Sequence, residues 1–134
     1  MAALTPDMIE AFQALKVFPL ATASKDGIPN VVPMGSVFLI DPSTIWIGDN
    51  FMHKSLNNVL ENPKAALYLY GAGAKGCYQI KANVTVKTEG PEHTRMAEMI
   101  HEKKPNLPAK TLLILTVTEV YECMPGADAG KLLV

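Results

Sequence analysis

Short runs rich in β-branched, aromatic and other apolar residues recur along this chain, and turn residues separate them. This pattern is typical of β-strands. It predicts six strands, which in chain order span residues 17–23, 29–40, 44–48, 64–70, 77–88 and 112–123. Between the first two strands, Lys25-Asp26-Gly27 indicates a hairpin turn, because glycine supplies the positive φ that such turns need.

Three segments carry helix signals instead. Thr5 is a favourable N-cap and Pro6 a favourable first helical residue, and apolar residues follow at helical spacing, so we expect an amphipathic helix over residues 6–16. A short helix is expected over residues 52–61. A third, which begins at a proline, is expected over residues 91–103.

Six strands with hairpin-like spacing and three short helices do not alternate as βαβ units would. The last strand contains Leu112-Leu113-Ile114-Leu115, which is apolar at every position, whereas a sheet with one face in water would alternate. A small closed barrel whose outside is covered by helices or by a second subunit would bury both faces of such a strand. The sequence therefore predicts a mainly β fold, a six-stranded antiparallel barrel with about three short helices.

Composition narrows the class of protein. The 134 residues suffice for one domain, residues 1–134, with its own core. No apolar run approaches the roughly 18 residues of a membrane span, and no signal peptide is evident, so we expect a cytoplasmic protein without membrane contact. A net charge of −1 with Arg95 as the single arginine argues against a nucleic-acid surface. Cys77 and Cys123 lack a Cys-x-x-Cys spacing and are expected to be small buried side chains rather than a disulfide.

The strand at 44–48 leads through a polar turn into the short helix that carries Lys54 and Ser55 near its start. Free backbone N–H groups, the positive end of the helix dipole, an ammonium and a hydroxyl can together bind one phosphate. We therefore expect a phosphorylated ligand here. The alternative to a phosphate-binding role is that Lys54 is a solvated surface residue.

Other motifs carry less chemistry. Gly71-Ala72-Gly73-Ala74-Lys75-Gly76 matches the dinucleotide fingerprint, but a strand rather than a helix is predicted after it, which favours a hairpin loop. His53, His93 and His101 are spread through the chain with no zinc ligand set, and His53 is expected to be an exposed turn residue. Trp46 is expected in the core. We find no hydrolytic constellation and assign no catalytic side chain and no metal ligand, so a bound cofactor would supply the chemistry.

Several segments together resemble one known family over nearly the whole chain. These are Leu20-Ala21-Thr22-Ala23, Asp26-Gly27-Ile28-Pro29-Asn30, Val32-Pro33-Met34, Ile47-Gly48-Asp49, Lys54-Ser55-Leu56-Asn57-Asn58, Glu61-Asn62-Pro63, Gly76-Cys77-Tyr78-Gln79-Ile80-Lys81 and Thr88-Glu89-Gly90-Pro91. Their order and spacing resemble the FMN-binding split β-barrel proteins related to pyridoxamine 5'-phosphate oxidase, in particular the short FMN-binding branch.

The resemblance implies a Greek-key split barrel that forms a homodimer with two FMN sites at the subunit interface. It implies that Lys54 and Ser55 hold the FMN phosphate, and that the strand around Val32 lines the ring and ribityl side. The turn after the third strand would meet the isoalloxazine edge. The cofactor-binding residues expected on this basis are Val32, Pro33, Met34, Gly35, Ile47, Gly48, Asp49, Asn50, Phe51, Met52, Lys54, Ser55 and Gln79.

The chain also departs from that family. True pyridoxamine phosphate oxidases are longer and end in a substrate motif that bears arginine and histidine, whereas this chain ends Gly130-Lys131-Leu132-Leu133-Val134. We therefore expect an FMN-binding oxidoreductase or electron-transfer protein with an unidentified redox partner, not a vitamin-synthesis oxidase. The alternatives are a non-catalytic flavin-binding or sensing module, or a split barrel that uses a deazaflavin or haem. The near absence of arginine disfavours the polyanionic deazaflavin.

Overall fold

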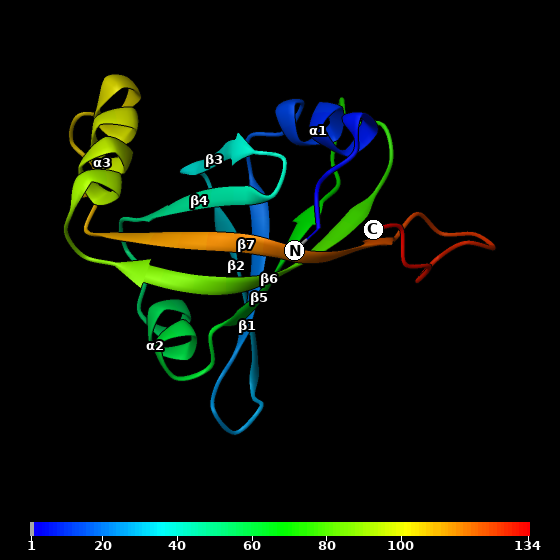
Figure 1. Cartoon of the computed structure of the whole chain (residues 1–134), viewed down its shortest axis with the longest axis horizontal. Coiled ribbons are helices and arrows are strands. Elements are labelled where there is room, and N and C mark those ends of the chain that lie inside the picture. The colour runs from blue at the N-terminus through cyan, green and yellow to red at the C-terminus, as the bar shows by residue number, and fades with distance from the viewer. Residues whose placement is uncertain (1) are drawn as a thin grey trace.

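A computed structural model describes residues 2–134, and its strands form one curled antiparallel sheet (Figure 1). The seven strands lie in the order β2-β1-β5-β6-β7-β4-β3. The elements in chain order are α1 (Pro6–Gln13), β1 (Phe18–Ala23), β2 (Pro29–Met34), β3 (Val37–Asp41), β4 (Thr44–Asp49), α2 (Lys54–Glu61), β5 (Lys64–Leu69), β6 (Tyr78–Lys87), α3 (Pro91–Lys103) and β7 (Thr111–Glu122). The predicted mainly β split barrel with three helices is confirmed.

The predicted strand count of six is corrected to seven, because the segment expected as one strand over residues 29–40 is divided. It forms β2 and β3 on either side of Gly35-Ser36, and these two strands are the opposite edges of the sheet. The N–H of Gly48 donates to the carbonyl of Ser36 at 2.9 Å, which holds this break against β4. A glycine weakens a strand and permits a bend. The same segment therefore connects the two edges of the curled sheet.

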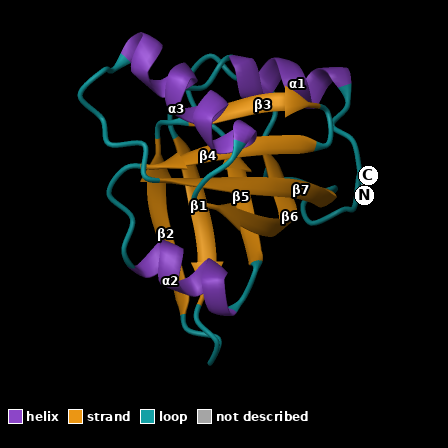
Figure 2. Ribbon diagram, turned by 60° about the vertical axis from the view of Figure 1, so that its left-hand side comes forward, coloured by secondary structure: helices purple, strands orange, loops and turns teal. Residues whose placement is uncertain are grey.

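The continuous apolar run of β7 is explained by burial on both sides of the sheet. Leu113 and Leu115 are fully buried in the main core inside the curled sheet. Leu112 instead packs outside the sheet, in a second cluster with Trp46 of β4 and Met96 of α3. Helix α3 thus covers the outside of β4 and β7 (Figure 2). Trp46 lies in a core, as predicted.

The local signals at the start of α1 and at the first hairpin turn are confirmed, whereas the helix expected over residues 52–61 begins two residues later, at Lys54. The Thr5 hydroxyl accepts a hydrogen bond from the N–H of Met8 at the start of α1, although this helix ends at residue 13 rather than 16. Gly27 has a φ of 86° in the turn between β1 and β2. The glycine-rich segment 71–76 connects antiparallel strands β5 and β6, so it is a hairpin loop and no helix follows it.

The C-terminal residues fold back on their own chain. The N–H of Gly130 donates to the carbonyl of Glu122 at 2.7 Å, and the N–H of Leu133 donates to the carbonyl of Val120 at 2.8 Å. The tail therefore lies beside the last part of β7, past the residues of β7 that pair with β4. The turn of the tail projects from the barrel (Figure 1). No helix in residues 2–134 is both long enough and apolar enough to cross a membrane.

Candidate functional site

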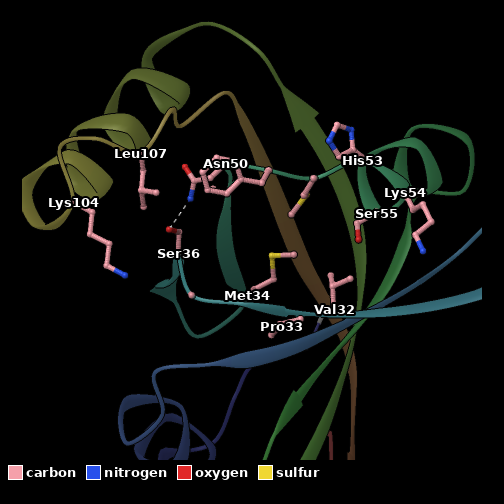
Figure 3. Close-up of a pocket in the computed structure, with 14 residues that line it drawn as sticks. Val32, Pro33, Met34, Ser36, Asn50, His53, Lys54, Ser55, Lys104 and Leu107 are labelled. Atoms are coloured by element: carbon pink, nitrogen blue, oxygen red, sulfur yellow. Dashed lines mark hydrogen bonds between the residues drawn. The ribbon is translucent and has the colours of Figure 1, made fainter.

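A cavity of about 470 Å³ lies where the break between β2 and β3, the end of β4 and the start of α2 meet (Figure 3). The loop after α3 forms its remaining wall. Its size falls in the range of small-molecule sites, roughly 300–1,000 Å³. The lining residues are Val32, Pro33, Met34, Gly35, Ser36, Gly48, Asn50, Phe51, Met52, His53, Lys54, Ser55, Lys104 and Leu107.

One end of the cavity is suited to an anion. Helix α2 begins at Lys54, and its N-cap residue, His53, makes no side-chain capping bond. The first bond of the helix runs from the N–H of Asn57 to the carbonyl of His53, so the N–H groups of residues 54–56 have no acceptor within the helix. Within residues 2–134 the Lys54 ammonium takes part in no ion pair. Positive charge and unpaired donors therefore coincide here.

The Ser55 hydroxyl is held by a network of buried and half-buried polar side chains. Ser55 is 3% exposed, and its Oγ accepts a hydrogen bond from Asn30 Nδ2 at 3.1 Å. The same amide lies 3.4 Å from Thr22 Oγ1, which also accepts from Asn58 Nδ2 at 3.0 Å. Because the Ser55 oxygen already accepts from Asn30, its O–H proton remains available as a donor. The sequence predicted Ser55 as a site residue, but it did not predict that Asn30 would hold the Ser55 hydroxyl.

The other part of the cavity is largely apolar, with fixed polar groups at its edge. Val32 and Met34 of β2 line it (Figure 3), and Met52 is a further apolar lining residue. Asn50 Nδ2 donates to Ser36 Oγ at 3.2 Å, and Asn50 Oδ1 accepts from the N–H of Ala109 at 3.0 Å. Asn50 thereby ties the β2–β3 break to the loop after α3. Apolar walls with a few oriented polar groups suit a flat organic ring.

The cavity gathers ten of the thirteen residues expected to bind a cofactor; Ile47, Asp49 and Gln79 do not line it. Ile47 is fully buried in the main core, because alternation along β4 turns its side chain inward. Asp49 is also fully buried. Its Oδ1 accepts from the N–H of Met52 at 2.8 Å, which shapes the turn before α2, while its Oδ2 has no partner within the described residues. Gln79 pairs with Tyr68 and Tyr121 within the sheet.

The cavity also includes four residues that were not predicted: Ser36, His53, Lys104 and Leu107. His53 is exposed, as expected, but it lies at the rim of the cavity (Figure 3). Ser36 directly follows Gly35, which was predicted, so an extension of the predicted segment by one residue would have included it. No local signal marks Lys104 and Leu107, because they reach the cavity only through the packing of α3 against β4.

The chain matches one protein family and one related sequence over almost its whole length. A model of the pyridoxamine 5'-phosphate oxidase family matches residues 4–124. An uncharacterized protein of Methanocaldococcus jannaschii, MJ0282, is 41% identical over 134 aligned positions, which cover 97% of this chain and 87% of the relative.

Solved structures share the fold at low sequence identity. HupZ of Group A Streptococcus superposes with a TM-score of 0.80 at 20% identity, over 95% of this chain and 99% of that one. An FMN-binding protein of Syntrophomonas wolfei gives 0.70 at 15% identity, over 88% and 84%. The haem storage protein HutZ of Vibrio cholerae gives 0.69 at 16% identity, over 90% and 95%, and an F420 reductase gives 0.61 at 16% identity, over 81% and 93%. Proteins with this fold thus carry names that refer to different ligands.

Proposed function

The chain belongs to the pyridoxamine 5'-phosphate oxidase family, and we propose that it is a flavoprotein that binds FMN in the cavity beside α2. We further propose that two copies associate so that the cofactor lies at their interface, and that the protein acts as an oxidoreductase or electron carrier. The observation that carries the proposal is the coincidence, in one cavity, of an anion-binding helix start and apolar walls.

The residues present fit the two ends of FMN. The phosphate would accept hydrogen bonds from the N–H groups that begin α2 and from the Ser55 hydroxyl, and Lys54 would contribute positive charge. Val32, Met34 and Met52 would contact the ring and exclude water from one face of it. When bound, FMN supplies the redox chemistry by accepting electrons or hydride at its ring. The chain itself holds and orients the ring, and the surrounding groups tune its potential.

The homodimer proposal rests on apolar side chains exposed on the edge strand β2 and at the rim of the cavity. Val31 of β2 is 66% exposed, and Phe51, at the rim of the cavity, is 73% exposed. Pro29 and Pro33 lie on the same exposed side of β2 as Val31. An apolar sheet edge of this kind is a liability in a monomer and is suited to an interface. A second copy placed over this edge would also lie beside the cavity, because Val32, Pro33 and Met34 of β2 line it.

Haem is a second candidate ligand, favoured by one observation. His53 lines the cavity, and an imidazole can coordinate haem iron. His93 and His101 hydrogen-bond to the carbonyls of Lys110 and Leu107 instead. The deazaflavin remains less favoured, because Lys54 and Lys104 are the only cationic residues that line the cavity within the described chain and neither is an arginine. A module that binds flavin without turnover would have the same site.

The experiment is the visible absorbance spectrum of the protein purified without added cofactor, followed by mass analysis of the released ligand. We expect a two-banded flavin spectrum and the mass of FMN. An intense haem band that His53→Ala abolishes would replace FMN with the second candidate. A colourless protein that does not bind added FMN would contradict the proposal. Reduction of the bound flavin by NADH or NADPH would then distinguish an enzyme from a storage or sensing module.

A further inference from the structure

The two cysteines of the chain face each other at the end of the barrel where β6 begins and β7 ends. Tyr78 of β6 pairs with Glu122 of β7, so the antiparallel register sets Cys77 opposite Cys123. The N–H of Cys123 donates to the carbonyl of Cys77 at 2.9 Å, which confirms this alignment. Directly opposed residues of an antiparallel pair point to the same face of the sheet. The backbone thus brings together two thiols that are 46 residues apart in sequence (123 minus 77).

The surroundings of the two thiols are shared but unequal. Cys77 is 1% exposed, Cys123 is half-buried, and neither forms a disulfide in this structure. The hydroxyl of Tyr68 lies 3.0 Å from Cys77 Sγ. This hydrogen bond is the main cause that raises the pKa of Tyr68 to about 12, and the nearby Cys123 contributes as well. Both sulfurs therefore influence the same phenol, as expected if they are neighbours.

We propose that Cys77 and Cys123 form a reversible disulfide within one chain, which ties the 70–77 loop to the start of the C-terminal tail. The pairing geometry supports both the formation of the disulfide and its reversibility. In a hydrogen-bonded antiparallel pair the Cα atoms lie about 5.5 Å apart, within the range that a disulfide can span. The Cβ atoms of such pairs lie about 4.5–5.5 Å apart, farther than the mean of about 3.8 Å in disulfides.

This separation makes the bond reversible. Closing it requires the two strand ends to approach each other, and a strained disulfide has a higher reduction potential than a relaxed structural one. The approach does not require a regular strand to bend, because β6 begins at Tyr78 and β7 ends at Glu122, so both cysteines lie just outside these strands.

The reaction is an exchange with a small-molecule disulfide such as oxidised glutathione. The thiolate of Cys123, the more accessible of the two, attacks one glutathione sulfur, forms a mixed disulfide and releases one reduced glutathione. Cys77 then loses its proton and attacks the Cys123 sulfur, and the second reduced glutathione leaves. Two protein thiols are oxidised, and one glutathione disulfide is reduced to two thiols.

The first step depends on pH in a defined direction. Burial is the main cause that raises the pKa of the Cys123 thiol above its ordinary value, with a smaller contribution from Cys77. Glu122 also raises this pKa and Lys81 lowers it, while Tyr68 faces Cys77 from β5. Because the thiolate is the nucleophile, we expect the rate of oxidation to rise by roughly tenfold per pH unit between pH 7 and pH 8.

The test is equilibration of the full chain in buffers of defined ratios of reduced to oxidised glutathione, followed by acid quenching, unfolding, alkylation and intact-mass analysis. We expect the mass of a single chain, with no alkylating reagent taken up in oxidising buffer and two equivalents taken up in reducing buffer, and we expect a peptide that links Cys77 to Cys123 after oxidation. In the oxidised protein the pKa of Tyr68 should fall from about 12 towards 10, which an alkaline absorbance titration measures.

Single variants provide the matched controls. Cys77→Ala should accumulate the glutathione adduct on Cys123, because the second step is removed, and Cys123→Ser should stay reduced, because Cys77 is buried. Two alkylated cysteines at every glutathione ratio would overturn the proposal. So would a glutathione adduct that persists on Cys123 of the unaltered protein, or a disulfide between two chains. None of these outcomes depends on FMN, so the proposal is independent of the proposed cofactor.

Discussion

Lys54 and Ser55 are adjacent in sequence but contribute differently to the anion-binding end of the cavity. Lys54 is exposed and free of ion pairs within residues 2–134, so it acts as a charge on a flexible stem. Ser55 is buried and fixed by Asn30, so it acts as an oriented hydrogen-bond donor. A lysine gives a point charge rather than the two-pronged contact of an arginine. Removal of the Lys54 side chain should therefore lower the affinity for an anion while Ser55 still binds it.

Replacement of Lys54 by alanine should weaken FMN binding specifically through the phosphate. A charge-assisted hydrogen bond contributes about 1.5–3 kcal/mol, which corresponds to about a tenfold to 150-fold rise in Kd. Riboflavin lacks the phosphate, so its affinity should not change, and flavin titration measures both ligands. Lys75→Ala, in the loop between β5 and β6, is the matched control and should leave FMN affinity unchanged. An unchanged FMN affinity in Lys54→Ala would remove Lys54 from the site.

At the scale of elements, the packing of α3 on β4 completes the cavity. Gly48 of β4 lies directly under α3, and a Cβ atom at this position would overlap Ile100 Cδ1 and would crowd Met96 Sδ. Both of those residues are buried. The absence of a side chain at Gly48 therefore lets α3 approach the sheet. That approach positions the loop that carries Leu107 and Lys104 at the cavity wall.

Gly48→Ala should destabilise the protein by about 1–3 kcal/mol, because overpacking forces buried side chains out of their favoured rotamers. Urea unfolding of the ligand-free protein measures the change in the free energy of unfolding. Gly35→Ala is a matched control: Gly35 also lines the cavity, but a Cβ atom there would meet no atom within 4 Å. Equal stability of the two variants would show that the contact between α3 and β4 is not this close.

At the scale of the whole molecule, the curled sheet leaves β2 and β3 as its edges. Residues of β2 alternate between exposed and half-buried, and Val31 is the apolar side chain at the centre of the exposed side. On β3 the exposed apolar residue is Ile40, near the end of the strand. The proposed dimer uses the β2 edge, because Val32, Pro33 and Met34 of this strand line the cavity.

Val31→Glu should dissociate the proposed dimer, because a charge buried at an apolar interface carries a large desolvation cost. Light scattering coupled to size-exclusion chromatography should give the mass of one chain instead of two, and FMN affinity should fall with it. Ile40→Glu introduces the same charge on the other edge and should leave the dimer intact. A monomeric unaltered protein, or dissociation by Ile40→Glu alone, would contradict the proposed interface.

The sequence by itself determined the features that depend on neighbouring residues. The existence and order of the three helices and of most strands follow from apolar periodicity, although the expected strand over residues 29–40 is divided and the helix expected from residue 52 begins at Lys54. Ten of the residues expected in the cofactor site indeed lie together. The family resemblance, rather than periodicity, supplied most of these, because it carries information about spatial neighbours that a local pattern lacks.

Only the tertiary structure decided the features that depend on distant contacts. The break at Gly35-Ser36 occurs because one segment must reach both edges of a curled sheet. Ile47 lies in the core because the direction of each side chain in β4 depends on its register with β7. Lys104 joins the cavity because α3 packs over Gly48. In each case the deciding interaction joins residues far apart in sequence, and the closure of the sheet brings them together.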